Sequence, residues 1–445
     1  MQAVIMAGGK GTRLSSVTKD IPKPMVQIDW KPLLEHQIEN LKEYGITDII
    51  LVTGYLGCVI KDYFGDGSGI SPSTGKPFDV NISYYSEDTP LGTAGALGKI
   101  KNRLQENFIL LFGDLFTCID YRRFIDFHKT KNADATLFVH PNSHPYDSDI
   151  VITNSDKKVI GWSYKNTERK EYYKNLVNAG IYVLNRKIAE YVSEIQLSGK
   201  EKVDLEKDVI TKLLDSKDYK IYGYQSSEYV KDLGTPERLE AVTKDYFSGI
   251  CQKRNLSNKQ KCIFLDRDGT VNKYVGFLRT VDQMELAPIA AEAVRKINGS
   301  EYLAVIITNQ PVIARGECSF EELERIHNKM YTLLGKEGAY LDGLYFCPHH
   351  PDSGFEGEVK ELKIDCDCRK PNIGMLKKAA EEHNIDLSKS WFVGDTYQDV
   401  QTGINAGMKT VLLSSGDKNK TNKYGCTPDY VAKDLNEAVE IILNQ

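Results

Sequence analysis

The chain has 445 residues, of which 41% are hydrophobic and 27% charged, and its net charge is −5. This length favours two or three domains, each large enough for its own core. The nearly balanced charge argues against nucleic-acid binding, and no apolar run reaches the ~20 residues that span a bilayer. The odd number of cysteines, nine, favours a reducing cytoplasm over a disulfide framework. We expect a cytoplasmic enzyme that acts on small molecules, with no nucleic-acid or membrane partner; a homo-oligomer stays open.

The first half alternates short apolar runs with amphipathic stretches. A helical spacing of apolar residues covers residues 33–44 and is followed by Gly45, which favours the end of a helix. Alternation of strands and helices predicts a largely parallel sheet covered by helices on both faces. The predicted buried strands are 3–6, 49–53, 108–112 and 135–139.

The alternation is interrupted at residues 249–260, a polar stretch without hydrophobic periodicity that reads as a linker. We therefore predict two Rossmann-like α/β domains with mainly parallel sheets, at 1–248 and 261–445. In such folds ligands bind beyond the carboxyl ends of the strands. The second set of predicted strands is 262–265, 303–307, 391–393 and 410–413.

A glycine-rich segment, AGGKGTRL at residues 7–14, directly follows the first predicted strand. Its glycines would let backbone N–H groups surround phosphate oxygens, and Arg13 would add a cationic fork. The segment matches neither a Walker A loop nor a dinucleotide fingerprint. A simple tight turn is the alternative for this loop taken alone.

Further motifs of the first half support phosphate binding. Lys23 lies on a stiff, proline-flanked segment, and the small-residue loop at 92–96 would let a flat base approach the backbone. Asp114 and Asp232 could together hold Mg²⁺ against phosphates, although either carboxylate could instead cap a helix or a turn.

Taken together, these motifs resemble the sugar-phosphate nucleotidyltransferases over residues 1 to about 247. The matching pieces are GGKGTRL, PKPM, LGTAGAL, GDLF, NAGIY, DLEKD and DLGTPE. The resemblance implies that Arg13 and Lys23 act on the phosphates of a nucleoside triphosphate and that Asp114 and Asp232 bind Mg²⁺. It implies nucleotide binding by Ala7, Gly8, Gly9, Gly11, Thr12, Arg13, Lys23, Gly92 and Thr93, and sugar-phosphate binding by Lys165, Asn178 and Gly180.

In such a reaction a sugar 1-phosphate oxygen attacks the α-phosphorus and pyrophosphate leaves, while the protein supplies positioning and charge neutralisation. The GTAGAL form of the second loop resembles guanylyl-transferring members, so GTP is the expected nucleotide. One departure is the sequence Tyr-Lys-Asn at 164–166, where the family often has Glu-Lys-Pro. Lys165 as a solvated surface charge therefore stays an alternative.

The second half places polar motifs after several predicted strands. Asp266 and Asp268, in the sequence DRDGT, are spaced so that one carboxylate could attack phosphorus while the other transfers protons. The other motifs are Thr308-Asn309-Gln310, Arg369-Lys370-Pro371 and the two carboxylates of GDTYQD at 394–399. The alternative is that these polar residues only cap helices and form turns.

A cysteine and histidine set lies between these motifs. Cys347, His349, Cys366 and Cys368 form a C-x-H…C-x-C pattern, and three thiolates with one imidazole suit tetrahedral zinc. Four protein ligands leave no open position for water, so the zinc would be structural. The alternative is that these residues pack as small hydrophobes. His350 is a weaker candidate ligand than His349.

From residue 261 to the C-terminus the chain resembles the haloacid dehalogenase-like phosphatases, and specifically the zinc-loop D-glycero-D-manno-heptose 1,7-bisphosphate phosphatases. The resemblance rests on DRDGTVN, TNQPVIARG, CPHHP, CDCRKPNIGM and VGDTYQD. It implies that Asp266 is the nucleophile and Asp268 the proton donor and acceptor. It also implies phosphoryl stabilisation by Thr308 and Lys370, substrate contacts by Asn309, Arg315 and Arg369, and Mg²⁺ held by Asp266, Asp268 and Asp395. Thr396 departs from the lysine common in heptose members, and Asp399 is expected to act behind the ligands.

The two resemblances imply consecutive steps of one pathway. The phosphatase would remove the 7-phosphate, and the transferase would then join the heptose 1-phosphate to GMP from GTP, giving a GDP-heptose for surface glycans. An alternative is a mannose 1-phosphate transferase fused to a phosphatase for another small phosphoester, such as histidinol phosphate. A sugar-nucleotide-binding regulator is a further alternative, but it would be expected to lack Asp114, Asp232, Asp266 or Asp268, all of which are present.

Overall fold

The computed structural model describes residues 1–9, 21–167, 169, 171–415 and 421–445. Contacts between Cα atoms divide the chain into two compact units. One unit comprises Met1–Val139, Val151–Trp162 and Asn178–Asn255, and the other comprises His140–Ile150, Ser163–Val177 and Leu256–Gln445. Two short segments of the first half of the sequence thus belong to the second unit.

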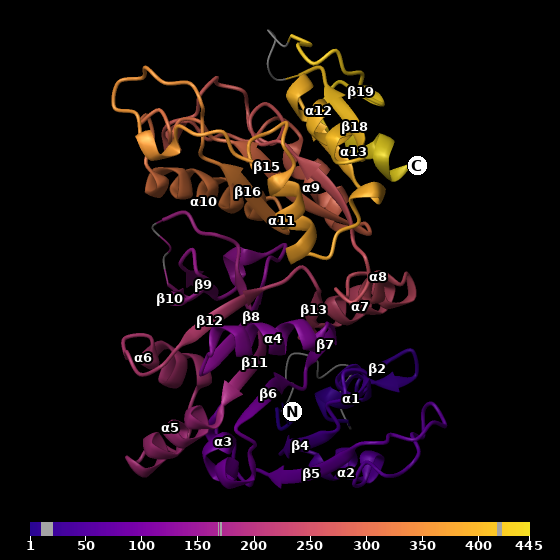
Figure 1. Cartoon of the computed structure of the whole chain (residues 1–445). Coiled ribbons are helices and arrows are strands. Elements are labelled where there is room, and N and C mark those ends of the chain that lie inside the picture. Colours follow the sequence, from indigo (N-terminus) through magenta and orange to yellow (C-terminus); the bar gives the residue numbers. More distant parts are fainter. Residues whose placement is uncertain (10–20, 168, 170, 416–420) are drawn as a thin grey trace. The chain divides into compact units, whose positions relative to one another are not determined.

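The first unit is built on a mixed sheet in the order β10-β9-β11-β6-β1-β4-β5, with β8 beside β11 and β12 beside β8. The central strands β1, β4, β5 and β6 run parallel, and β11 is antiparallel to β6. Its strands are β1 (Gln2–Met6), β2 (Gln27–Ile28), β3 (Lys31–Pro32), β4 (Asp48–Thr53), β5 (Asn81–Ser86), β6 (Asn107–Phe112), β7 (Leu115–Cys118), β8 (Ala135–His140), β9 (Ile150–Thr153), β10 (Val159–Ser163), β11 (Val177–Asn185), β12 (Ile221–Gln225) and β13 (Tyr229–Asp232). Its helices are α1 (Leu33–Glu43), α2 (Gly57–Phe64), α3 (Gly95–Ile100), α4 (Tyr121–Lys131), α5 (Arg186–Leu197), α6 (Thr211–Leu213), α7 (Pro236–Phe247) and α8 (Ile250–Lys253) (Figure 1).

The second unit has a fully parallel sheet in the order β16-β15-β14-β17-β18-β19. Its strands are β14 (Lys261–Leu265), β15 (Tyr302–Asn309), β16 (Gly343–Cys347), β17 (Trp391–Gly394), β18 (Lys409–Leu413) and β19 (Tyr430–Ala432). Its helices are α9 (Ala290–Asn298), α10 (Phe320–Lys336), α11 (Gly374–Glu382), α12 (Tyr397–Asn405) and α13 (Leu435–Leu443). The predicted α/β class with mainly parallel sheets is confirmed.

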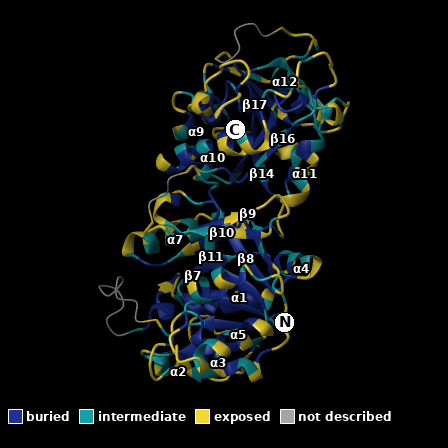
Figure 2. Cartoon of the chain, turned by 90° about the vertical axis from the view of Figure 1, so that its left-hand side faces the viewer, coloured by how far each residue is buried: buried dark blue, intermediate teal, exposed yellow. Residues whose placement is uncertain are grey.

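Each sheet is buried by helices, as its apolar strands require. Residues 3–5 of β1 and 262–265 of β14 are completely buried, and Figure 2 shows β14 in dark blue. Since β14 is central in its sheet, the motif that follows it emerges among the carboxyl ends of neighbouring strands.

The segment expected to be a linker is not structureless. Residues Ile250–Lys253 form α8, in which Cys251 is buried against Tyr229 and Val242 in one core cluster. The polar stretch is ordered because Cys251 is buried in this cluster and Ile250 packs against it.

Across the described part of the chain, no helix is both long and apolar enough to cross a membrane.

Candidate functional site

Asp266 directly follows β14 and is 8% exposed. Its Oδ1 atom accepts hydrogen bonds from the backbone N–H of Arg267 at 2.7 Å and lies 2.8 Å from Lys370 Nζ. Burial raises the pKa of the Asp266 carboxyl, and Lys370 opposes that rise. The structure thus brings together two residues that are 104 positions apart in the sequence and that were expected to act on one phosphoryl group.

Two carboxylates contact this ammonium group, and a third lies close to both of them. Asp266, Asp395 and Asp399 each offer an oxygen within 4.8 Å of the others, and all three residues are buried. Lys370 Nζ donates to Asp399 Oδ1 at 2.5 Å. One ammonium cannot balance three buried carboxylates, and hard oxygen ligands suit Mg²⁺, so the donor set fits the expected ion.

Asp399, which was expected to lie behind the metal ligands, lies close to Asp266 and Asp395, and one of its oxygens accepts from Lys370. Its other oxygen accepts from the backbone N–H and the hydroxyl of Thr396, which fixes Asp399 at the start of α12. A Cβ at Gly394 would lie 2.4 Å from Asp399, so only glycine permits this close approach.

The carboxylate of Asp268 points elsewhere. Arg267 Nη2 donates to both of its oxygens at 2.9 Å, and Gln310 Nε2 donates to Oδ2 at 2.8 Å. Asp268 is not part of the carboxylate cluster, so the structure does not bring this side chain to the other two expected Mg²⁺ ligands. Gln310 Nε2 also donates to Thr308 Oγ1 at 2.9 Å, which ties the expected phosphoryl-binding hydroxyl to Asp268.

Asn309 fixes the backbone of Lys370. Its Oδ1 accepts from the backbone N–H of Lys370 at 3.0 Å, and its Nδ2 donates to the Lys370 carbonyl at 3.3 Å. This pair of contacts gives Asn309 a role in placing Lys370 that the sequence did not suggest.

The C-x-H…C-x-C residues converge on one point. The three sulfur atoms lie 3.2–3.5 Å apart, and His349 Nδ1 lies 3.3 Å from Cys368 Sγ. Tetrahedral zinc with Zn–S bonds near 2.3 Å needs sulfur atoms about 3.8 Å apart, so the site could close around a zinc ion with small shifts. Burial raises the pKa of Cys368 to about 11, which means that a bound cation is what would keep these thiols ionised.

His350 is not part of this cluster. Its Nε2 lies 3.3 Å from Arg315 Nη2, and the Arg315 guanidinium lies 4.2 Å and 4.6 Å from the ring centres of Phe277 and Phe355. Arg369 Nη1 donates to the His349 carbonyl at 3.0 Å. Arg369 therefore contacts the backbone of an expected zinc ligand, and Arg315 contacts the residue next to that ligand.

In the first unit, Lys23 and Asp114 come together. Lys23 Nζ donates to Asp114 Oδ2 at 2.6 Å. Strand β13 pairs with β7 so that Asp232 lies opposite Leu115, next to Asp114. Burial alone would raise the pKa of Asp232, but Arg238 and Lys23 lower it below its ordinary value. Each expected Mg²⁺ ligand thus has a cationic partner in this structure.

The described part of the glycine-rich loop follows β1 directly. A Cβ at Gly8 would lie 3.1 Å from Glu87 Oε2, so a side chain there would be crowded. Gly92 has a φ of +86°, and a Cβ there would lie 2.5 Å from the Val203 carbonyl oxygen. Thr93 Oγ1 accepts from the Leu205 backbone N–H at 2.8 Å. Gly11, Thr12 and Arg13 lie outside the described residues.

The expected sugar-binding residue Asn178 contacts a residue that sequence reasoning left out. Asn178 Nδ2 donates to Glu206 Oε1 at 2.5 Å and to Tyr182 Oη at 2.6 Å. Glu206 lies in the DLEKD motif, so the match to that motif could have identified it. Gly180 has a φ of +76° and packs against Phe112. Lys165 is exposed, and it lies in a segment of the other unit.

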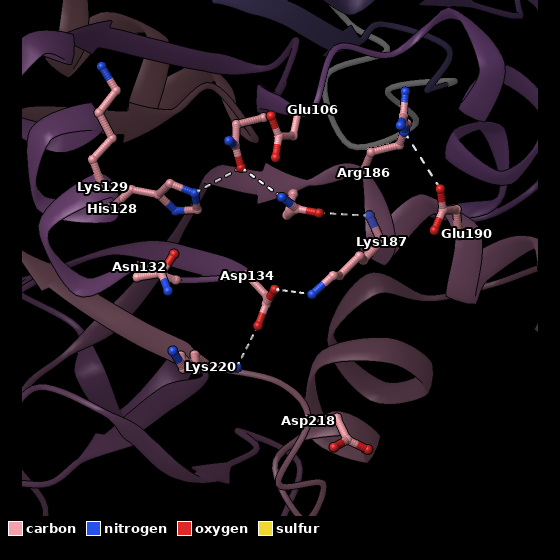
Figure 3. A pocket seen from close by; sticks show the side chains of 13 residues that line it. Glu106, His128, Lys129, Asn132, Asp134, Arg186, Lys187, Glu190, Asp218 and Lys220 are labelled. Carbon is pink, nitrogen blue, oxygen red and sulfur yellow. Dashed lines mark hydrogen bonds and ion pairs between the residues drawn. The ribbon is translucent and has the colours of Figure 1, made fainter.

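A separate polar pocket of about 670 Å³ lies at the amino end of β6, whereas Asp114 follows its carboxyl end. His128, Asp134 and Lys187 are among its lining residues, and Figure 3 shows the Lys187–Asp134 ion pair. None of the expected site residues lines this pocket.

Comparison with known proteins identifies both halves. The profile of the nucleotidyl transferase family matches residues 2–249, and a profile described as HAD-hydrolase-like matches residues 367–438. The chain belongs to the nucleotidyl transferase family, with a HAD-like hydrolase in its second half. It is therefore an enzyme, and the fusion expected from the sequence motifs is confirmed.

Three curated relatives agree with this division. The nucleotidyl transferase half is 33% identical over 246 residues to a D-glycero-alpha-D-manno-heptose 1-phosphate guanylyltransferase of Aneurinibacillus thermoaerophilus, covering 55% of this chain and 98% of that one. It is also 33% identical to a mannose-1-phosphate guanylyltransferase of Mycobacterium tuberculosis, covering 56% of this chain and 66% of that protein's length. The HAD-like half is 39% identical to a D-glycero-beta-D-manno-heptose-1,7-bisphosphate 7-phosphatase of Yersinia pestis, covering 39% of this chain and 90% of that one.

Proposed function

We propose that this chain carries out two consecutive steps of nucleotide-activated heptose synthesis. The HAD-like half removes the 7-phosphate of D-glycero-D-manno-heptose 1,7-bisphosphate, and the nucleotidyl transferase half transfers GMP from GTP to the heptose 1-phosphate. The observation that carries the proposal is the presence in one chain of two halves whose relatives act on a heptose bisphosphate and on a heptose 1-phosphate.

In the phosphatase, Asp266 attacks phosphorus through Oδ2, because Arg267 and Lys370 already contact Oδ1. The bond from phosphorus to the C7 oxygen breaks as an aspartyl-phosphate forms, and Asp268 gives a proton to the leaving alkoxide. Asp268 then takes a proton from the water that hydrolyses the intermediate. Lys370 and the Thr308 hydroxyl stabilise charge on the transferring group.

Asp266 and Asp395 would hold Mg²⁺ in this proposal, with Asp399 close by. Asp268 would contribute its backbone carbonyl, because Arg267 and Gln310 hold its side chain. The ion supplies positive charge that offsets repulsion between the nucleophile and the phosphate. Cys347, His349, Cys366 and Cys368 hold structural Zn²⁺. Since Arg369 and Lys370 come directly after the last cysteine, the zinc loop fixes their position. Arg315 and Arg369 are then available for the phosphate that stays on C1.

In the transferase, Lys23, with Arg13 of the glycine-rich loop, neutralises the triphosphate, and the loop and Gly92-Thr93 hold the nucleotide. Asp114 and Asp232, which pair with Lys23 and Arg238, would hold Mg²⁺, and the ion would neutralise charge on the phosphates. Asn178 and Gly180 contact the sugar phosphate, while Lys165, which belongs to the other unit, is left out of this site. The phosphorus–oxygen bond to pyrophosphate breaks as the sugar phosphate oxygen bonds to the α-phosphorus.

The shared intermediate sets a stereochemical requirement. The C1 phosphate survives the first step, so the phosphatase must accept the anomer that the transferase uses. The two relatives are named for different anomers of the heptose: the phosphatase for beta and the guanylyltransferase for alpha. We assign the alpha anomer to both halves, because hydrolysis at C7 leaves the C1 centre unchanged and the relative of the transferase half is named for the alpha anomer. The reducing cytoplasm, where nucleoside triphosphates and free thiols coexist, is the proposed location.

The test uses the purified full-length chain with Mg²⁺, each anomer of the bisphosphate and each of the four nucleoside triphosphates. We expect phosphate and pyrophosphate to be released together with the alpha anomer and GTP, and a GDP-heptose to form. Release of neither product from any combination would refute the proposal.

A second candidate follows from the mannose-1-phosphate guanylyltransferase relative. If mannose 1-phosphate is the acceptor, pyrophosphate release from GTP should be faster with mannose 1-phosphate than with heptose 1-phosphate. Comparing kcat/KM for the two acceptors decides between the candidates.

A further inference from the structure

Arg267 is the largest side chain among those that the structure describes as fully buried. A guanidinium stays charged at any ordinary pH, so burying it is costly unless its charge is balanced and its N–H groups find acceptors. The residue lies between Asp266 and Asp268, where nothing in the proposed chemistry requires a buried cation. Its contacts show what it does there.

Arg267 holds the carboxylate of Asp268 from one side. Nη2 contacts both oxygens at 2.9 Å, and Nε donates to Oδ1 at 3.2 Å. Asn272 Nδ2 donates to Oδ1 at 3.1 Å. These donors fix the plane of a carboxylate whose side chain is still 20% exposed, so it remains within reach of solvent and substrate.

Gln310 extends this arrangement to the phosphoryl-binding hydroxyl. Its Oε1 accepts from Arg267 Nη2 at 2.9 Å, while its Nε2 donates to Asp268 at 2.8 Å and to Thr308 at 2.9 Å. The relative position of Asp268 and Thr308 therefore depends on one buried amide and one buried guanidinium.

His327 of α10 orients the guanidinium from behind. Its Nε2 lies 3.1 Å from Arg267 Nη1, and the residue is 6% exposed. A guanidinium can only donate hydrogen bonds, so Nε2 must accept and the ring must be neutral, with its proton on Nδ1. Burial and the charge of Arg267 lower the pKa of His327 well below its ordinary value, which agrees with this assignment. The ring packs against Phe346, with centroids 5.6 Å apart.

We infer that His327, Gln310 and Arg267 are positioning residues that hold the Asp268 carboxylate for proton transfer. The inference rests on the proposed phosphatase function. His327 acts only through Arg267, because its described contact in this network is with Nη1. A misplacement of ~1 Å can lower a catalytic rate about 100-fold, and general acid–base catalysis contributes about 10²–10⁴-fold. Loss of the His327 acceptor should therefore affect kcat more than KM.

The experiment compares His327→Gln with His327→Asn in the full-length chain. Both variants are neutral amides, but only the longer Gln side chain can place an oxygen where Nε2 lies now. We expect H327N to lower kcat about 10- to 100-fold with KM within about 2-fold of the wild type, and H327Q to stay within about 3-fold in both constants. Thermal melts report the folded fraction of each preparation.

His383→Asn provides a matched control, since His383 is another buried histidine of the same unit and packs against Tyr345. H383N should lower stability without the kcat defect of H327N. Equal kcat in H327N and the wild type, equal loss in H327N and H327Q, or equal loss in H327N and H383N would each overturn the inference. The rates are also measured with p-nitrophenyl phosphate, so that failure of the heptose substrate in the wild type is seen separately.

Discussion

The two catalytic units use the same kinds of side chain in very different surroundings. In the phosphatase site, the side chains of Lys370, Asp266 and Asp399 are 3%, 11% and 1% exposed. In the transferase site, Asp114 and Asp232 are 38% and 37% exposed, although each also pairs with a cation. Charges attract more strongly away from water, so the buried site holds its groups in a tight network while the open site leaves them free to exchange partners.

This difference follows from the chemistry that we propose for each unit. A carboxylate that forms a covalent bond to phosphorus gains from a dry environment with fixed dipoles. A transferase that only positions a nucleotide and a sugar phosphate needs an open cleft and charges that can release their partners to Mg²⁺. If the two units work independently, a substitution in one site should leave the activity of the other site unchanged.

The largest effect is expected for Asp266→Asn. The amide cannot form an aspartyl-phosphate, so phosphate release should fall by at least about 10⁴-fold, as is typical when a nucleophile is removed. Pyrophosphate release from GTP and heptose 1-phosphate should stay within about 2-fold. A parallel loss of both activities would show that the units are coupled.

The reciprocal change, Asp114→Asn, should lower nucleotidyl transfer about 10²- to 10³-fold, because the amide is a poor ligand for Mg²⁺ and leaves Lys23 without its carboxylate. Phosphate release from the bisphosphate serves as the control and should not change. If raising the Mg²⁺ concentration fails to recover any transfer in this variant, Asp114 has a role other than binding the ion.

A smaller effect, about 10- to 100-fold on phosphate release, is expected for Cys366→Ser. Loss of one thiolate should release zinc, which is measured by metal analysis, and disorder the loop that carries Lys370. Cys426→Ser, at a cysteine outside the cluster, is the matched control. Nucleotidyl transfer should stay nearly intact in both variants, and unchanged zinc content in Cys366→Ser would contradict the assigned ligands.

The smallest effect concerns stability and not catalysis. Burial lowers the pKa of His128 from 6.5 to about 4, so below pH 6.5 the unfolded chain binds a proton that the folded chain does not. The free energy of unfolding should therefore be unaffected by this group above pH 6.5 and should decrease as the pH falls toward 4, by about 2 kcal/mol at pH 5.

Urea unfolding of the first unit at pH 7 and pH 5 measures that decrease, and His128→Gln should make the pH dependence shallower. His36, whose pKa burial likewise lowers to about 4, keeps its own contribution in this variant. Because His128 lies at the amino end of β6, away from Asp114, transfer at pH 7 should not change in His128→Gln.

Much of the fold could be predicted from local patterns. The apolar runs at 3–6, 108–112 and 262–265 became β1, β6 and β14, since runs of this length between polar motifs suit a buried strand and are short for a buried helix. What the pattern could not predict was α8 in the polar stretch near residue 250, because the burial of Cys251 depends on a partner cluster distant in sequence. Nor could it reveal that residues 140–150 and 163–177 would cluster with the second unit.

The candidate sites divide in the same way. The identity of the cysteine and histidine set, and of Asp266 with Lys370, follows from residue type and spacing, because metal and phosphoryl chemistry accept few alternatives. The spacing of residues along the chain does not tell which side chains contact one another. Asp268 was expected beside Asp266 at a metal ion, but its side chain is held by Arg267 and Gln310, while Asp399 joins the carboxylate cluster.

The sequence by itself was enough to identify the two enzyme families, and its motifs predict a nucleophile, an acid, phosphate ligands and metal ligands without any knowledge of the fold. Only the tertiary structure decided how those groups are oriented and which residues hold them by hydrogen bonds. His327 on α10 and Gln310 after β15 could be connected to the site only because packing brings both of them to Arg267. The physical reason is that hydrogen bonds depend on distance and direction in space, which residue order along the chain does not specify.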